Sequence, residues 1–99
     1  MMRADYDSQG KTIQITLQDV ERADFGDKIG EPLAAIVAVA NNEAVAVDLL
    51  GPDLDIDAPL KIAAERYDLD REALVAAARA ALAAPDRVVR LDVGVRASG

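Results

Sequence analysis

Apolar and polar residues alternate along the first part of the chain. Within 11–18 the apolar residues Ile13, Ile15 and Leu17 fall at every second position, which is the spacing of a half-buried β-strand. A shorter alternation precedes it at 3–7. The intervening Asp7-Ser8-Gln9-Gly10 has Asp first and Gly last, which favours a type I turn. We therefore predict a β-hairpin over 3–18.

Two apolar runs follow, 33–40 and 44–50, on either side of Asn41-Asn42. Asn tolerates positive φ, so this pair predicts a tight type I′-like turn. In that register position 40 lies opposite 43, 38 opposite 45 and 36 opposite 47. One face then carries Ile36, Ala38, Val45, Val47 and Leu49, and the other carries Leu33, Ala35, Val37, Val39, Ala44, Ala46 and Leu50. Because both faces are apolar, we expect both to be covered.

Helical periodicity begins after Gly51-Pro52. Asp57 is a suitable N-cap for a helix over 58–67, and Asp70 for a longer helix from 71 to about 84, which Pro85 ends. The second helix has an inward stripe at helical spacing, formed by Leu74, Ala77, Ala78, Ala81 and Leu82. A final alternation predicts a half-buried strand within 87–96, through Val89, Leu91, Val93 and Val95.

These elements predict one α+β domain over 1–99. We expect an antiparallel sheet of two hairpins (3–18 and 33–50), a helix pair on one face (58–84) and a C-terminal edge strand. The segment 19–32 is polar, with two Gly and one Pro, and reads as a connection without a strand. Phe25, the single Phe of the chain, is expected to anchor that connection to the body of the domain.

Missing residue types restrict the chemistry. The chain has no His and no Cys, which removes the usual general base, the commonest metal ligand and thiol catalysis. We therefore expect no enzyme, no catalytic residue and no cofactor. The chain lacks a secretory leader pattern and an apolar run long enough to span a membrane, so a cytoplasmic location away from membranes is expected.

Three sets of carboxylates are candidates for chemistry. Asp53, Asp55 and Asp57 alternate and could offer oxygen ligands to Ca²⁺ or Mg²⁺, although an acidic solvated edge that ends in an N-cap is the simpler interpretation. Asp5 and Asp7 lie on a strand and are expected to be solvated. Asp48 interrupts an apolar face, which favours an ion pair with an Arg or a place at an interface over catalysis.

The helix pair also has the spacing of a helix-turn-helix, but its chemistry does not suit DNA. Eight of the twelve residues over 73–84 are Ala, whereas base and phosphate recognition needs polar or basic side chains and a positive field. The chain carries a net charge of −7. We therefore do not expect nucleic acid as a partner.

Charge and apolar surface point instead to protein partners. Residues 1–57 hold 12 acids and 4 bases, net −8, whereas residues 58–99 hold 6 acids and 7 bases, net +1. The acidic part is explained by solubility, or it could steer a small basic protein toward the sheet. The two-faced apolar hairpin and the Ala-rich helix predict a homodimer, in which a partner sheet covers the second face.

Residues 6–50 resemble a family of small bacterial proteins known as domain of unknown function 2283. The resemblance lies in Tyr6-Asp7, in Thr12-Ile13-Gln14-Ile15-Thr16-Leu17, and in Ile36-Val37-Ala38-Val39 followed by Val45-Ala46-Val47-Asp48-Leu49-Leu50. Ser8-Gln9-Gly10 and Asn41-Asn42-Glu43 depart from the family pattern. The family implies no activity and no site residues, but a role in two-gene stress modules is suspected for some members and would suit an acidic binder.

The functional hypothesis is a non-enzymatic dimeric protein–protein interaction module, with a regulatory or antitoxin-like role as its specific form. The alternative is a small-ligand or metal-binding domain with a pocket between sheet and helices. An enzyme that works with carboxylates alone has no positive sequence feature in its favour.

Overall fold

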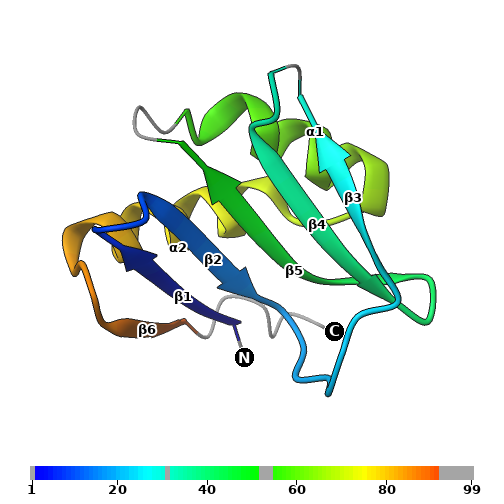
Figure 1. Ribbon diagram of the computed structural model, residues 1–99, viewed down its shortest axis with the longest axis horizontal. Helices are drawn as coiled ribbons and strands as arrows, with labels where there is room; N and C mark the ends of the chain where they lie inside the picture. The colour runs from blue at the N-terminus through cyan, green and yellow to red at the C-terminus, as the bar shows by residue number, and fades with distance from the viewer. Residues whose placement is uncertain (1, 31, 52–54, 92–99) are drawn as a thin grey trace.

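The computed structural model describes residues 2–30, 32–51 and 55–91 (Figure 1). The first hairpin is formed by β1 (Met2–Asp7) and β2 (Thr12–Thr16), and the prediction of two alternating strands is confirmed. The turn is longer than the predicted type I turn, because Lys11 N–H donates to the Asp7 carbonyl at 2.7 Å and Lys11 takes a φ of 57°. The Asp7 carboxylate accepts from the backbone N–H groups of Gln9 and Gly10, which is the expected role of Asp at a turn start.

The connection after the first hairpin contains a strand, β3 (Phe25–Ile29), that the sequence pattern did not predict. Its anchor is Ile29, which is 1% exposed, whereas Phe25 is 56% exposed. The expectation that Phe25 anchors this segment was therefore wrong. The physical reason is position: Phe25 begins an edge strand and lies opposite Val39 at the end of β4, where nothing described covers it.

The second hairpin joins β4 (Ala35–Ala40) to β5 (Glu43–Leu50). Asn41 and Asn42 take φ values of 55° and 65°, so the type I′-like turn is confirmed. The predicted register holds for Ala40 opposite Glu43 and for Val39 opposite Ala44, and then fails, because an irregularity at Ala38/Val39 places Ala38 opposite Ala46 instead of Val45. Val45 is the extra residue, and its carbonyl accepts from the N–H groups of both Leu17 and Gln18. Such bulges shift the alternation of faces by one residue.

The bulge decides which apolar set faces the helices. Ala35, Val37 and Val39 of β4 are buried together with Val47 and Leu49 of β5. On the predicted face, Ile36 and Ala38 were grouped with Val47 and Leu49, but these two residues lie on the opposite side of the sheet. The prediction assumed a strict two-residue period along β5, and the bulge interrupts that period.

Two helices follow, α1 (Asp57–Tyr67) and α2 (Arg71–Ala83). Asp70 caps α2 as predicted, accepting from the N–H of Ala73 at 3.1 Å. Asp57 is not the N-cap of α1. The helix starts at this residue, Ile56 precedes it, and the Asp55 carboxylate accepts from the N–H of Ala58. The predicted inward stripe of α2 is buried except for Leu82, which is 37% exposed near the helix end; the buried members are Leu74, Ala77, Ala78 and Ala81.

The last strand, β6 (Val88–Leu91), pairs with β1 and completes an antiparallel sheet in the order β3-β4-β5-β2-β1-β6. Val93 and Val95, which the sequence placed in this strand, lie outside the described residues. The segment before β6 is held to the first hairpin, since Ser8 Oγ donates to Asp86 Oδ2 at 2.7 Å and Ser8 N–H donates to Asp86 Oδ1 at 3.0 Å. These bonds lower the pKa of Asp86, the hydroxyl contributing most.

Both helices lie behind the sheet in Figure 1, with α2 across β1 and β2 and α1 beside β3 and β5. The core between the layers consists of fully buried aliphatic side chains, the largest being Ile13, Ile15, Ile29, Leu49, Leu60 and Leu74. The predicted α+β architecture, with two helices on one sheet face and the C-terminal strand at an edge, is therefore confirmed.

Candidate functional site

The second face of the sheet is not covered by α1 or α2 (Figure 1), and we call it the open face. Strand pairing places its side chains in cross-strand rows, since residues opposite each other in antiparallel strands point to one side. One row runs through Lys28, Ile36, Asp48, Gln14, Asp5 and Val88. The neighbouring row runs through Gly26, Ala38, Ala46, Thr16, Arg3 and Arg90.

The half of the open face formed by β3, β4 and β5 is mostly apolar, and many of its side chains are small. Ile36, Ala38, Ala46 and Leu50 are half-buried there. Gly26 lies opposite Ala38, and a Cβ at this glycine would come within 2.9 Å of Ile36 Cγ2. The side chain of Ile36 therefore lies over the backbone of β3, and the row beside it holds only small residues. Small residues allow a second surface to approach closely.

Asp48 is the one half-buried acid within this apolar half among the described residues, since Glu43 at the start of β5 is exposed. Its Oδ1 is buried and accepts no hydrogen bond from a described residue, and Asp48 forms no ion pair with the described part of the chain. Burial raises the pKa of Asp48, and the nearby Asp5 carboxylate adds to the rise, whereas the Gln14 amide opposes it. The intramolecular partner Arg that the sequence suggested is therefore not seen, and a buried acceptor is left without its hydrogen bond.

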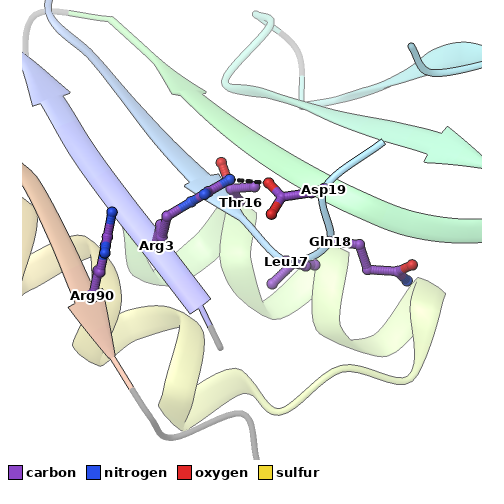
Figure 2. A pocket seen from close by; sticks show the side chains of 6 residues that line it. All are labelled: Arg3, Thr16, Leu17, Gln18, Asp19 and Arg90. Carbon is purple, nitrogen blue, oxygen red and sulfur yellow. Dashed lines mark hydrogen bonds and ion pairs between the residues drawn. The ribbon is translucent and has the colours of Figure 1, made fainter. Parts of the chain in front are cut away.

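The other half of the open face, formed by β2, β1 and β6, is polar. Arg3 and Arg90 lie directly opposite each other in the β1–β6 pair. Figure 2 shows both side chains beside a pocket of about 350 Å³, with Arg3 directed toward Asp19. The Arg3 guanidinium forms an ion pair with the Asp19 carboxylate. The pocket is lined by Arg3, Thr16, Leu17, Gln18, Asp19 and Arg90.

A second polar cluster ties the edge strand β3 to helix α1. The Asp27 carboxylate accepts from Arg66 Nη1 at 2.8 Å and from the Tyr67 hydroxyl at 2.7 Å. The Arg66 hydrogen bond and then the Tyr67 hydrogen bond lower the pKa of Asp27. Burial and the bond to Asp27 raise the pKa of Tyr67. Sequence reasoning missed this cluster because its partners are 39 and 40 residues apart and β3 was not predicted.

The remaining acidic candidates are not gathered into a site. Asp53 lies outside the described residues, Asp55 caps the start of α1, and Asp57 pairs with Arg79 at 3.8 Å. Asp7 holds the first turn, and Asp5 lies on the open face two strands from Asp48. Among residues 2–30, 32–51 and 55–91, the structure contains no group of three or more side chains placed to hold a metal ion.

The helices offer less to a ligand than the open face does. Residues of both helices, among them Ala63, Leu74 and Ala77, are buried in the core. The centre of the space between sheet and helices is filled by fully buried side chains such as Ile15 and Leu60. At its rim a pocket of about 470 Å³ is lined by residues of both layers, among them Ala44 and Tyr67. In the described part of the chain, no helix is long and apolar enough to cross a membrane. Comparison of the chain with protein-family models, with curated proteins and with solved structures found no match.

Proposed function

We propose that this protein is a non-enzymatic interaction module that forms a homodimer through the apolar half of its open face. The observation that carries the proposal is the row Lys28–Ile36–Asp48, in which a cation and an anion stand on either side of an aliphatic residue. Neighbouring strands are about 4.8 Å apart, so Lys28 and Asp48 of one chain lie roughly 10 Å apart. Each charge is one strand away from Ile36.

This row is complementary to itself. A two-fold axis that runs along β4, between two facing sheets, stacks Ile36 on its own copy and brings β3 of each chain over β5 of the other. Lys28 then faces Asp48 of the second chain at both ends of the row. In the neighbouring row Gly26 faces Ala46, and Ala38 faces Ala38. Two-fold contacts of this kind are the commonest in homo-oligomers.

The dimer contact would provide partners for two side chains that have none among the described residues of the single chain. Lys28 is exposed and has no ion pair with a described residue, and Asp48 Oδ1 has no hydrogen-bond donor. Stacked sheets pack about 10 Å apart, a distance that facing Lys and Asp side chains can bridge. The small residues of the second row permit this approach.

The expected dimer is weak, because the overlap is small. Three strands of about six residues cover roughly 14 Å by 20 Å, well below the ~800 Å² that each partner of a standard interface buries. We expect a dissociation constant of roughly 10–100 µM. The strands β2, β1 and β6 remain outside this overlap in both chains.

A second protein partner is the other part of the proposal. Exposed acids cluster in the 17–24 loop, where Asp19, Glu21 and Asp24 are exposed, and residues 1–57 carry a net charge of −8. Such a surface attracts a basic protein and speeds its association. A small basic protein is therefore the partner we propose, in a regulatory or antitoxin-like pairing.

Sedimentation equilibrium from about 10 µM to about 1 mM tests the dimer, because mass action populates a weak dimer only at high concentration. We expect the mass to rise from 10.5 kDa toward twice that value. The variant Lys28→Glu places an acid opposite Asp48 at both ends of the row and is expected to weaken association at least roughly tenfold. Lys61→Glu, an equal charge change on an exposed position of α1, is the control and should leave it unchanged.

Mixing two variants separates this geometry from other dimers. Lys28→Glu and Asp48→Lys each create repulsive homodimers, but a heterodimer of the two has one native and one reversed ion pair. We expect the mixture to associate more strongly than either variant alone, with circular dichroism as the check that Asp48→Lys folds. If it does not fold, Asp48→Asn replaces it and should weaken the homodimer. A monomer at 1 mM would overturn the proposal, and a dimer insensitive to Lys28→Glu would place the interface elsewhere.

A further inference from the structure

We propose that the pocket between Arg3 and Arg90 binds a small molecule that carries a phosphate monoester. The first observation is the β1–β6 register, which places Arg3 and Arg90 directly opposite each other, with both side chains lining one pocket on the open face. Like charges in this position destabilise a sheet. An anion bound between them would remove that repulsion.

The local charge differs in sign from that of the chain. The six residues that line the pocket carry two positive charges and one negative charge, in a chain with a net charge of −7. Asp19 already occupies the Arg3 guanidinium, whereas Arg90 is exposed and forms no ion pair with a described residue. Arg3 is thus paired with a carboxylate of the chain itself, and Arg90 lies beside Arg3 (Figure 2).

The Arg3–Asp19 pair is easily exchanged for a ligand. The Asp19 side chain is 77% exposed, and ion pairs between exposed groups contribute little to stability. Asp19 therefore acts as an internal competitor that occupies the site until a stronger anion arrives. The backbone around Asp19 belongs to the 17–24 loop rather than to a strand, so the carboxylate can turn away without breaking the sheet.

Charge balance selects the class of ligand. With Asp19 displaced, the two arginines present a charge of +2, and a phosphate monoester carries −1.5 to −2 near pH 7. Guanidinium forks match phosphate oxygens in pairs, and two opposed forks can share the three oxygens of one phosphate. Thr16 adds a hydroxyl to the lining. Gln18 adds an amide, which donates to Glu43 Oε1 at 3.0 Å.

The pocket has room for more than the phosphate. Its volume of about 350 Å³ is at the low end of small-molecule sites, so a compact organic phosphate fits better than a nucleotide. Because β1, β2 and β6 lie outside the proposed dimer contact, the pocket stays open in monomer and dimer alike. This inference therefore does not depend on the proposed function.

The test is a titration of the full chain, followed by NMR, with inorganic phosphate, glycerol 3-phosphate and succinate at constant ionic strength. We expect both phosphates to shift the amide resonances of Thr16–Asp19 and of Arg90. Arg90→Gln should weaken glycerol 3-phosphate binding at least roughly tenfold. The control Arg87→Gln makes the same charge change at an exposed residue outside the pocket and should change binding less than twofold.

Asp19 provides a variant that should gain affinity. Asp19→Asn removes the competitor and is expected to tighten phosphate binding several-fold, whereas Glu21→Gln, an exposed acid of the same loop, should have little effect. Equal effects of Arg90→Gln and Arg87→Gln would mean general attraction to a charged surface and would overturn the proposal. Succinate binding as tightly as the phosphates would overturn the phosphate assignment, as would the absence of any shift.

Discussion

Replacing Asp48 with Asn should stabilise the isolated chain at neutral pH. The carboxylate is partly buried and its Oδ1 has no hydrogen-bond partner among the described residues. Asn keeps a polar atom at this position but removes the negative charge. A buried group without a partner costs about 1–3 kcal/mol, and more when it is charged, so a gain at the lower end is expected because Asp48 is only half-buried. A gain of about 1 kcal/mol corresponds to a rise in Tm of about 4–8 °C for a domain of this size.

The pH dependence of this gain follows from the direction of the pKa shift. In the folded chain the pKa of Asp48 lies above its ordinary value of 3.8. Between 3.8 and the raised value the folded state binds more protons than the unfolded state, so wild-type stability falls as pH rises through this window. At pH 7 the full cost is present, whereas at pH 3 both states are protonated. The advantage of Asp48→Asn should therefore disappear at pH 3.

Thermal unfolding by circular dichroism at about 0.5 µM, where a dimer with a dissociation constant of roughly 10–100 µM is largely dissociated, measures this effect. Glu65→Gln, at an exposed position of α1, is the matched control and should change Tm little at either pH. If Asp48→Asn lowers Tm at pH 7 under these conditions, the carboxylate is making favourable contacts within one chain. The reasoning that assigns it an external partner would then be refuted.

Four further outcomes concern stability and are measured by urea or thermal unfolding. Leu74→Ala empties a fully buried position and should cost about 2–5 kcal/mol. Asp70→Ala removes the α2 cap and should cost about 1 kcal/mol. Asp68→Gly should stabilise the chain, because Asp68 ends α1 with a φ of 56° that glycine adopts without strain. Asp27→Asn should flatten the acid limb of the stability curve: the pKa of Asp27 is lowered, so its contribution is present above pH 3.8 and is lost as pH falls through the lowered value. A steeper acid limb in that variant would contradict the assignment.

Elements with a clean period were predictable from the sequence. The alternation of Ile13 and Ile15, and the helical spacing of Leu74, Ala77 and Ala81, each describe one buried side, and those side chains are buried. Asn41-Asn42 was recognisable because the turn requires positive φ at two residues.

Other elements depend on contacts that no local pattern encodes. Strand β3 has Gly26, Asp27 and Lys28 at its centre and only Ile29 fully buried, since an edge strand needs little apolar surface. The bulge at Val45 was hidden because both sides of β4 and β5 are apolar, so a shift of register leaves the sequence pattern equally satisfied. The resemblance to domain of unknown function 2283 stays a prediction.

For the candidate site, the sequence indicated an individual residue but not how the residues of the site are arranged. Asp48 could be singled out because it is an acid within an apolar run, but its missing partner is a property of the folded sheet. The Arg3–Arg90 pair could not be found from the sequence, because it depends on the register of two strands at opposite ends of the described chain. The Lys28–Ile36–Asp48 row required β3 to be known.

The strand order β3-β4-β5-β2-β1-β6 also has a consequence for synthesis on the ribosome. The outer edge of β1 pairs with β6, and 80 residues separate Asp7 from Val88. At ordinary elongation rates of 5–20 residues per second, the outer edge of β1 stays unpaired for roughly 4–16 s, until β6 has been synthesised. The unpaired N–H and C=O groups of a strand edge can form hydrogen bonds with a strand of another chain, which leads to aggregation. The nascent chain is thus most vulnerable to aggregation in this interval, and a chaperone or an early-binding partner would act at β1.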